Sequence, residues 1–247
     1  MVGSLAMWTI IDTGKGSAER NMEVDAMLLE AIEPGAAPIL HFYRWERPSA
    51  TYGYFVNPED HLTETACAEL DLARRATGGG IVFHLWDLAF SAIVPATAPF
   101  FSENTLSNYG FINRAVAKAV ETYGGQVKNA TLIPEDAPSL DASCGRFCMA
   151  RPTKYDVVLH GKKIAGAAQR QKKQGYLHQG TISLKPPSVD QLDSWLKTGS
   201  RVLEAMQSYT FALLPADANE ASLEKARNSL QDLLFQSLLD QTHTYAT

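Results

Sequence analysis

The 247-residue sequence has no long hydrophobic run, and no stretch approaches the roughly 20 consecutive apolar residues of a membrane-spanning helix. The N-terminus also lacks a basic region followed by a long apolar segment, which argues against a secretory signal peptide. Apolar residues make up 45% of the chain and charged residues 20%, as in ordinary globular proteins. We therefore expect a cytoplasmic protein with no membrane partner.

Positive charge and cysteine are both scarce. The formal net charge of −5 argues against a nucleic-acid-binding protein, which normally presents a basic face. The three cysteines, Cys67, Cys144 and Cys148, are too few for a disulfide scaffold and include no Cys-x-x-Cys pair. We expect neither a nucleic-acid partner nor a metal site in the protein itself.

Hydrophobic periodicity predicts helices and strands in the first half of the chain. Asn21 is a capping-type residue, and helical spacing of apolar residues follows it over 21–32. The aromatic-rich stretch 37–55 is interrupted by proline and glycine, which predicts two strands with a turn. A second helix is expected over 57–75. Two apolar runs within 80–95 predict a hairpin or a bulged pair of strands.

The second half begins with an amphipathic pattern over 105–125, which ends on two glycines and predicts a helix. Residues 155–184 are typical of three strands with a tight turn at Gly161, and the chain is helical from about 186. No linker or repeat interrupts this order. We expect one α+β domain over 1–247, with a mixed or antiparallel sheet, flanking helices and a helical C-terminal tail.

The segment "RRATGGGIVFH", residues 74–84, places three glycines before a strand-like run. It matches neither the P-loop nor the dinucleotide-binding fingerprint, because no Gly-Lys-Ser/Thr follows and the glycine spacing differs. One interpretation is a turn or bulge between a helix and a strand. The other is a backbone that approaches a ligand closely, with converging N–H groups and the charge of Arg74 or Arg75 beside them. The segment alone leaves both open.

A second cluster, "GKKIAGAAQR" at 161–170, sets Lys162 and Lys163 at a strand start. Gly166 follows between small residues, so a bulky ligand could lie against its backbone while a lysine projects beside it. Lysines of this kind are more often simply solvated, because a functional lysine needs a partner in space.

The segments "RRATGGGIVFH…DLAFS", "YDVVLHGKKIAGAAQR" and "LHQGTISL" resemble the lipoate-protein ligase and octanoyltransferase family, whose catalytic domain is related to biotin protein ligases. "NMEVD" and "FYRWERPSATYGYF" extend the resemblance to roughly residues 8–184, with five blocks in the family's order. The resemblance implies a biotin/lipoate protein ligase-like fold in which the glycine block and the lysine strand hold the reactive carbonyl of an acyl chain.

The resemblance also implies roles for individual positions. Lys163, directly before Ile-Ala-Gly, matches the family's catalytic lysine, whereas Lys162 matches a basic position without that role. Leu85 stands where an acidic residue is common after the histidine. The residues that match the substrate-binding blocks are Arg75, Gly78, Gly79, Gly80, His84, Gly166, Ala167, Gln169, His178 and Gly180.

A cysteine distinguishes the two reactions of this family. A ligase activates lipoate with ATP and Mg²⁺ as an adenylate, whereas a transferase carries the acyl group on its own cysteine. "FCMARPTKYDVV" resembles the cysteine block of the octanoyltransferase branch and puts Cys148 at the nucleophile position. Cys144 lies outside that motif, and Cys67 is expected on a helix face. Gly80 is the ligase-like form of its position, so the ligase stays an alternative.

We expect a transferase that needs no cofactor, with Cys148 and Lys163 as its catalytic residues. The resemblance implies octanoyl-acyl carrier protein or a lipoylated H protein as donor, and a lipoyl domain or glycine-cleavage H protein as acceptor. The expected oxyanion donors are backbone N–H groups at 78–80 or near Gly166. Lys163 is expected to favour the thiolate, to hold the acyl carbonyl and to help deprotonate the incoming amine. The aromatic residues Tyr43, Trp45 and Tyr52 are candidates for the wall of the acyl site. A non-catalytic relative that binds a lipoyl domain is a further alternative.

Overall fold

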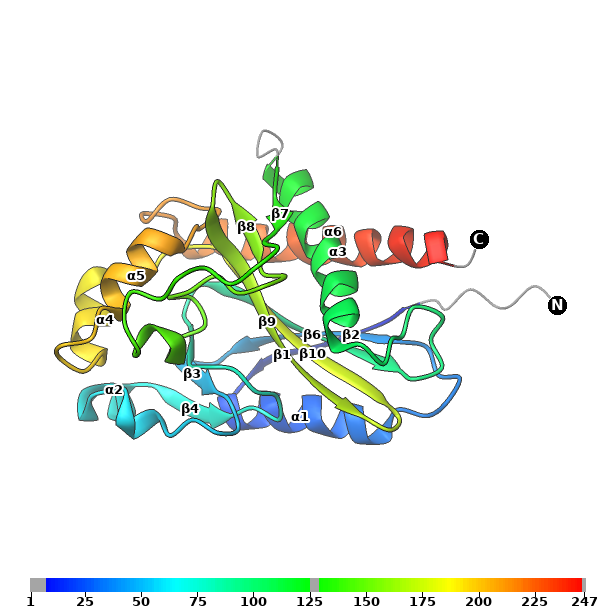
Figure 1. Ribbon diagram of the computed structural model, residues 1–247, viewed down its shortest axis with the longest axis horizontal. Helices are drawn as coiled ribbons and strands as arrows, with labels where there is room; N and C mark the ends of the chain where they lie inside the picture. Colours follow the sequence, from blue (N-terminus) through cyan, green and yellow to red (C-terminus); the bar gives the residue numbers. More distant parts are fainter. Residues whose placement is uncertain (1–7, 125–128, 246–247) are drawn as a thin grey trace.

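The computed structural model describes residues 8–124 and 129–245, and a seven-stranded mixed sheet forms its centre (Figure 1). Within this sheet, as far as it is described, β1 and β2 pair in parallel and the other neighbouring strands are antiparallel. Strands β6 and β10 are central and buried along their whole length, which accounts for the nearly continuous apolar run of β6. The strand order is β1 (Thr9–Gly16), β2 (Ile39–Trp45), β6 (Asp87–Pro95), β10 (Gly175–Ser183), β9 (Lys162–Lys172), β8 (Val157–Leu159), β7 (Thr131–Leu132).

A separate three-stranded sheet has the order β4 (Asp71–Arg74), β3 (Ser49–Tyr52) and β5 (Val82–His84). Its apolar side packs with three short helices into a second hydrophobic cluster. These helices are α2 (Glu64–Glu69), α4 (Val189–Trp195) and α5 (Val202–Tyr209), and two 3-10 turns, Pro58–Asp60 and Cys144–Arg146, complete this region.

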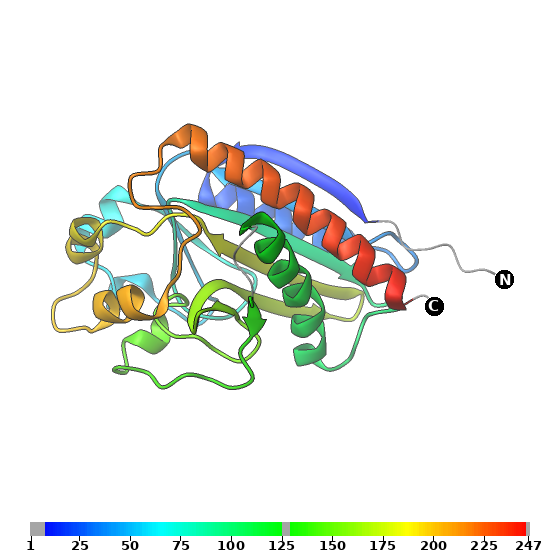
Figure 2. The same cartoon turned by 90° about the horizontal axis from the view of Figure 1, so that it is seen from above.

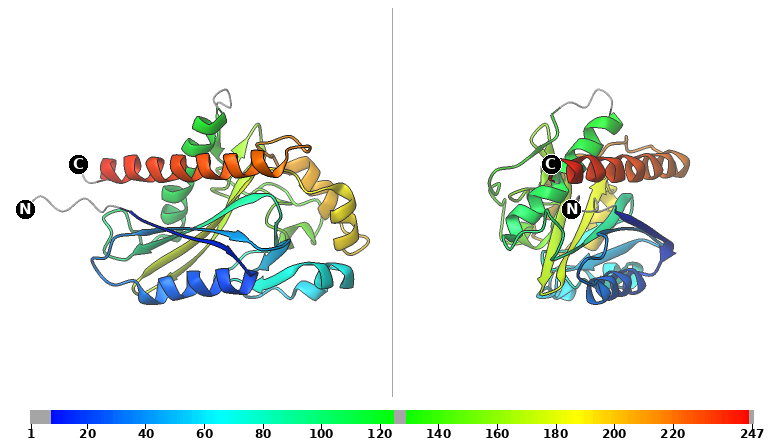
Figure 3. Two further views of the ribbon diagram at one scale, coloured as in Figure 1. Left: turned by 180° about the vertical axis from the view of Figure 1, so that it is seen from behind. Right: turned by 90° about the vertical axis from the view of Figure 1, so that its right-hand side faces the viewer.

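Helices cover both faces of the large sheet (Figures 1 and 3). Helix α1 (Ala18–Ala31) packs Leu29 against Ile93 of β6 and Leu177 of β10. The opposite face is covered by α3 (Thr105–Gly124) and α6 (Glu220–Tyr245). The small sheet therefore shares its side of the large sheet with α1, and this side carries the site described below.

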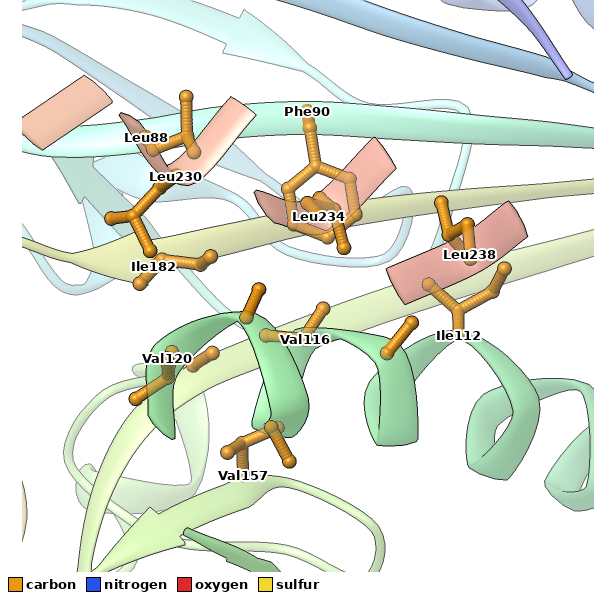
Figure 4. Packing of buried hydrophobic residues seen from close by; sticks show 14 of the residues in the cluster. Leu88, Phe90, Ile112, Val116, Val120, Val157, Ile182, Leu230, Leu234 and Leu238 are labelled. Carbon is orange, nitrogen blue, oxygen red and sulfur yellow. The ribbon is translucent and has the colours of Figure 1, made fainter. Parts of the chain in front are cut away.

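Helix α6 crosses α3 and packs against it over the sheet (Figures 1 and 2). Leu230, Leu234 and Leu238 are completely buried and meet Ile112 and Val116 of α3 (Figure 4). The helical C-terminal tail expected from the sequence is confirmed in α6, whose buried leucines pack on the main core. Because α6 closes the main core, the predicted helical tail is an integral part of the fold. No helix among the described residues combines the length and hydropathy needed to cross a bilayer.

The α+β fold with a mixed sheet, flanking helices and a C-terminal helix is confirmed. The three strands predicted over 155–184 are β8, β9 and β10, joined first by a turn in which His160 and Gly161 have positive φ. Helix α1 begins earlier than predicted, because the side chain of Ser17 accepts from the N–H of Arg20 and caps it. The second glycine predicted to stop α3, Gly125, lies outside the described residues.

Two predicted elements are wrong. The helix expected over 57–75 ends with α2, and residues 71–74 form strand β4 instead. The carboxylate of Asp71 accepts from the N–H of Ala18, so a contact distant in sequence fixes this strand. The hairpin expected over 80–95 is also absent: β5 pairs with β3, whereas β6 pairs with β2 and β10. The chain crosses from one sheet to the other at Leu85 and Trp86.

Candidate active site

An apolar cavity lies between the small sheet and the face of β9 and β10 that points toward it. The space between its lining atoms, part of which is open to solvent, is about 410 Å³. Small residues on β9 leave this space open, and Tyr43 is the one predicted aromatic wall residue that lines it. The lining residues are Met22, Tyr43, Thr51, Arg75, Val82, His84, Cys148, Met149, Gly166, Ala167, Ala168, Gln179, Gly180 and Thr181.

The triple glycine forms a loop held from inside by Arg75. Nη2 of this buried guanidinium donates to the carbonyl oxygens of Gly78, at 2.9 Å, and Gly80, at 2.7 Å. Thr77 anchors the same loop by donating to Gln179 Oε1 at 2.7 Å. With the carbonyls turned inward, the N–H groups of Gly78, Gly79 and Gly80 donate to no described residue. The loop therefore offers free donors beside the cavity.

A short backbone bridge places Cys148 against this loop. Ile81 donates to the carbonyl of Arg146 at 2.6 Å, and Cys148 donates to the carbonyl of Ile81 at 2.9 Å. A Cβ at Gly80 would lie 2.3 Å from the Arg146 carbonyl oxygen, so only glycine allows this approach. In sequence, Gly80 resembled the ligase form of this position. In the structure, packing explains the glycine, because it lets the segment that carries Cys148 approach the loop.

The Cys148 sulfur and the Arg75 guanidinium both lie beside Gly79. A Cβ built on Gly79, whose φ is +86°, would be 3.5 Å from Sγ and 3.4 Å from Nη2 of Arg75. Burial lowers the pKa of Arg75, but charge attraction and a hydrogen bond to the Cys148 thiol oppose that shift. Arg75 is therefore the cation that contacts the sulfur and can stabilise a thiolate there.

Lys163 contacts the backbone of Cys148 and not its sulfur. Its Nζ donates to the Cys148 carbonyl oxygen at 2.6 Å and pairs with Asp156 Oδ2, also at 2.6 Å. Both side chains of the pair are almost fully buried. A Cβ at Gly166 would lie 2.4 Å from Cε of Lys163, so this glycine makes room for the lysine itself.

A second, more polar cavity of about 690 Å³ lies on the outer side of Cys148. It shares Cys148, Ala167 and Ala168 with the apolar cavity, so the thiol stands where the two meet. The glycine loop, Lys163 and Arg151 line the outer cavity. An acyl chain could lie in the inner cavity while polar groups reach its carbonyl from the outer one.

The other two cysteines have different surroundings. Cys144 is completely buried, and burial together with the Asp141 carboxylate raises the pKa of its thiol, which favours the unreactive form. Cys67 is half-buried on α2, as expected, and packs beside the second hydrophobic cluster.

Most of the predicted site residues come together, but three differ in orientation. His178 lies on the opposite face of the sheet, under α3, where its Nδ1 is 2.7 Å from the side-chain amide of Gln169. Burial lowers the pKa of His178 to about 3. Gln169 reaches only the outer cavity. Gly180 lines the inner cavity by its backbone, and its missing side chain makes room for the ring of Phe90.

Two of the three aromatic residues predicted to line the acyl site lie outside the inner cavity. Trp45 stacks on the ring of His84 at 4.1 Å outside the cavity, and Tyr52 borders a different surface depression.

Sequence reasoning missed several polar residues that the fold brings to the site. Thr51 contacts both Arg75 and His84, and Asp87 contacts His84. Asp156 pairs with Lys163. The histidine does have an acidic partner, placed three residues after it instead of at Leu85. Only Asp156 carried a signal, because it lies within the segment "FCMARPTKYDVV" that resembles the cysteine block. No group of three or more His, Cys, Asp or Glu in the described ranges could hold a metal ion.

The fold and this site define an enzyme with a thiol at the junction of an apolar and a polar cavity. A family profile described as "Lipoyl protein ligase A/B catalytic domain" matches residues 17–226, and the chain belongs to that family. It is 31% identical to Octanoyltransferase LipM of Macrococcus caseolyticus, over 87% of this chain and 80% of that protein. It is 32% identical to Octanoyltransferase LipM of Carboxydothermus hydrogenoformans, over 77% and 69% of the two chains.

Solved structures support the same fold. A lipoate-protein ligase A bound with ATP superposes with a TM-score of 0.69 at 23% identity, covering 98% of this chain and 93% of that one. A bipartite lipoate protein ligase of Thermoplasma acidophilum, described with its E2 lipoyl domain, superposes with a TM-score of 0.68 at 23% identity. The match covers 97% of this chain and 91% of that one. At this identity the likeness concerns the fold alone.

Proposed function

We propose that this protein is an octanoyltransferase of protein lipoylation and that Cys148 carries the acyl group. The observation that supports this most is the position of the Cys148 thiol, at the junction of an apolar and a polar cavity. Arg75 and the free N–H groups of the glycine loop lie beside it. A ligase that acylates through an adenylate needs no thiol at this point.

In the first half-reaction the Cys148 thiolate attacks the carbonyl carbon of an octanoyl thioester on a carrier protein. The Sγ–C bond forms and the carrier thiolate leaves, taking up a proton. The N–H groups of Gly78, Gly79 and Gly80 stabilise the oxyanion, while the octanoyl chain occupies the inner cavity. Arg75 favours the thiolate by its charge.

In the second half-reaction a lysine amine of the acceptor enters through the outer cavity and attacks the thioester. The C–N bond forms, Sγ leaves with its electron pair, and the amine proton passes to the departing sulfur. Lys163, paired with Asp156, acts here as a cation that holds the Cys148 carbonyl and thereby the thioester in place. This role replaces the base function expected from the sequence.

The proposal includes the expected partners. Octanoyl-acyl carrier protein or a lipoylated H protein is the donor, and a lipoyl domain or H protein is the acceptor. We further propose that residues 1–247 act as one catalytic domain without a cofactor. A cytoplasmic location stays a prediction.

The test is to incubate the protein with octanoyl-acyl carrier protein without ATP and to measure its intact mass. We expect one octanoyl adduct, which is absent in Cys148→Ala and retained in Cys144→Ala, the matched control. If no adduct forms while free lipoate and MgATP modify a lipoyl domain, the protein is a ligase. If it binds the lipoyl domain and transfers from no donor, it is a binding protein.

A further inference from the structure

Four buried side chains form an unbroken polar chain that ends at Cys148. Asp87 Oδ2 lies 2.6 Å from His84 Nδ1, and Nε2 of the same ring lies 2.8 Å from Thr51 Oγ1. Nη1 of Arg75 donates to Thr51 Oγ1 at 2.8 Å. We call these residues, Asp87, His84, Thr51 and Arg75, the polar chain. Each is less than 9% exposed.

The hydrogen-bonding capacity of each group gives the polar chain a direction. A guanidinium only donates, so Thr51 Oγ1 accepts from Arg75, and its own hydrogen is free for His84 Nε2. In the neutral ring, His84 Nε2 then accepts and Nδ1–H is donated to Asp87, and this tautomer is part of the proposal tested below. Burial acts to raise the pKa of Asp87, but His84, Thr181 and Arg227 outweigh it and lower that pKa below its usual value. Asp87 is therefore the ionised end of the chain.

Arg75, the other end of the polar chain, sets the geometry around the reacting sulfur. Nη2 of Arg75 holds the Gly78 and Gly80 carbonyls and lies beside Gly79 and Sγ of Cys148. The stacked ring of Trp45 restricts the His84 ring from one side. An isolated guanidinium has several rotamers, whereas one bonded at Nη1 and Nη2 keeps one position.

We propose that Asp87, His84 and Thr51 are positioning residues that fix Arg75 through one directed set of hydrogen bonds, and that this makes Cys148 reactive. The role of a reactive Cys148 in transfer rests on the proposed function, but the reactivity of the thiol does not. The two ideas can therefore fail separately.

The first test compares Thr51→Val with Thr51→Ser. Valine keeps the shape and removes the hydroxyl, so Arg75 and His84 both lose their bond, whereas serine retains it. We expect alkylation of Cys148 by iodoacetamide at neutral pH, followed by peptide mass spectrometry, to slow by about tenfold in Thr51→Val. Thr51→Ser should stay close to the unmodified protein. Equal rates in folded Thr51→Val and Thr51→Ser would overturn the proposal, whether or not acyl transfer occurs.

The second test observes the His84 tautomer by ¹⁵N NMR. In the unmodified protein we expect the proton on Nδ1. In Asp87→Asn an amide that donates to Nδ1 should move the proton to Nε2 and slow the alkylation of Cys148. A proton on Nε2 in the unmodified protein would contradict the proposed direction, and this result does not depend on whether Thr51→Val folds.

Discussion

At the scale of single residues, the glycines of the loop differ in what they make possible. At Gly80 the Arg146 carbonyl comes so close that a Cβ would overlap it. At Gly79 space is sufficient, but the φ of +86° is one that residues with side chains rarely adopt. Around Gly78 there is open space within 4 Å of a built Cβ. The same motif thus contains one position set by packing and another that faces an open region.

This difference predicts that alanine at the two positions has different effects on stability. Gly80→Ala should lower the free energy of unfolding by about 1–3 kcal/mol, because its Cβ overlaps backbone that must move. Gly78→Ala, the matched control, should change it little. Urea unfolding measures both, and an equal effect at the two positions would contradict the assigned contact.

The buried ion pair of Lys163 and Asp156 gives a second prediction at this scale. Asp156→Asn keeps the shape but leaves the lysine ammonium buried without its counter-ion, which should cost about 3–5 kcal/mol of stability. Adding Lys163→Met to that variant should restore part of the loss, because the uncompensated charge is removed. Thermal and urea unfolding of the single and double variants test this. A double variant no more stable than Asp156→Asn would argue against the charge as the cause.

At the scale of elements, β10 separates two environments. Gln179 and Thr181 face the inner cavity, whereas His178 faces α3 on the other side of the sheet. Alternation along a strand requires this division. The family resemblance marked His178 as part of the cleft, but the register of β10 gives it a place in the core.

The burial of His178 predicts a pH dependence of stability. Its pKa is lowered to about 3 in the fold, and the unfolded chain has a value near 6.5. The unfolded state therefore binds the proton first, and stability falls as the pH drops below about 6.5. Between pH 7 and 5 the contribution of this group should be about 2 kcal/mol. Urea unfolding of His178→Gln should show a smaller loss over this range than the unmodified protein. An identical pH dependence of the two would contradict the prediction.

At the scale of the whole molecule, α6 and α3 close the main core on one face of the large sheet, and the small sheet and α1 form the site on the other. Helix α6, the 26-residue helix at the C-terminal end of the described chain, therefore stabilises the large sheet. Strand β9 of this sheet carries Lys163 and the residues that neighbour Cys148.

Substitutions in α6 should show this directly. Leu234→Ala removes a completely buried side chain and should cost about 2–5 kcal/mol of unfolding free energy. Leu233→Ala, one residue away and only partly buried, should cost clearly less. Urea unfolding distinguishes the two, and equal losses would mean that α6 does not pack as described.

Local pattern and resemblance predicted the sheet strands of 155–184, the helices α3 and α6, and the meeting of Cys148, Lys163 and the glycine loop. They did not predict β4, because Asp71 is fixed by a contact with Ala18 that no local pattern contains. They also predicted Lys163 as the cation beside the Cys148 thiol, whereas the structure places Arg75 there. Arg75 and Lys163 are both near Cys148, and only side-chain geometry assigns one to the sulfur and the other to the carbonyl. Thr51 and Asp87 had no signal, since the polar chain joins residues of three strands.

The central claim, that Cys148 carries the acyl group between two proteins, is tested most directly by a chase. The octanoyl-enzyme is isolated, freed of donor and mixed with a lipoyl domain in the absence of ATP, and both intact masses are followed in time. We predict that the octanoyl mass leaves the enzyme and appears on the acceptor lysine at the same rate. An adduct that persists on the enzyme, or an acceptor that gains the acyl group only with MgATP, would contradict the account.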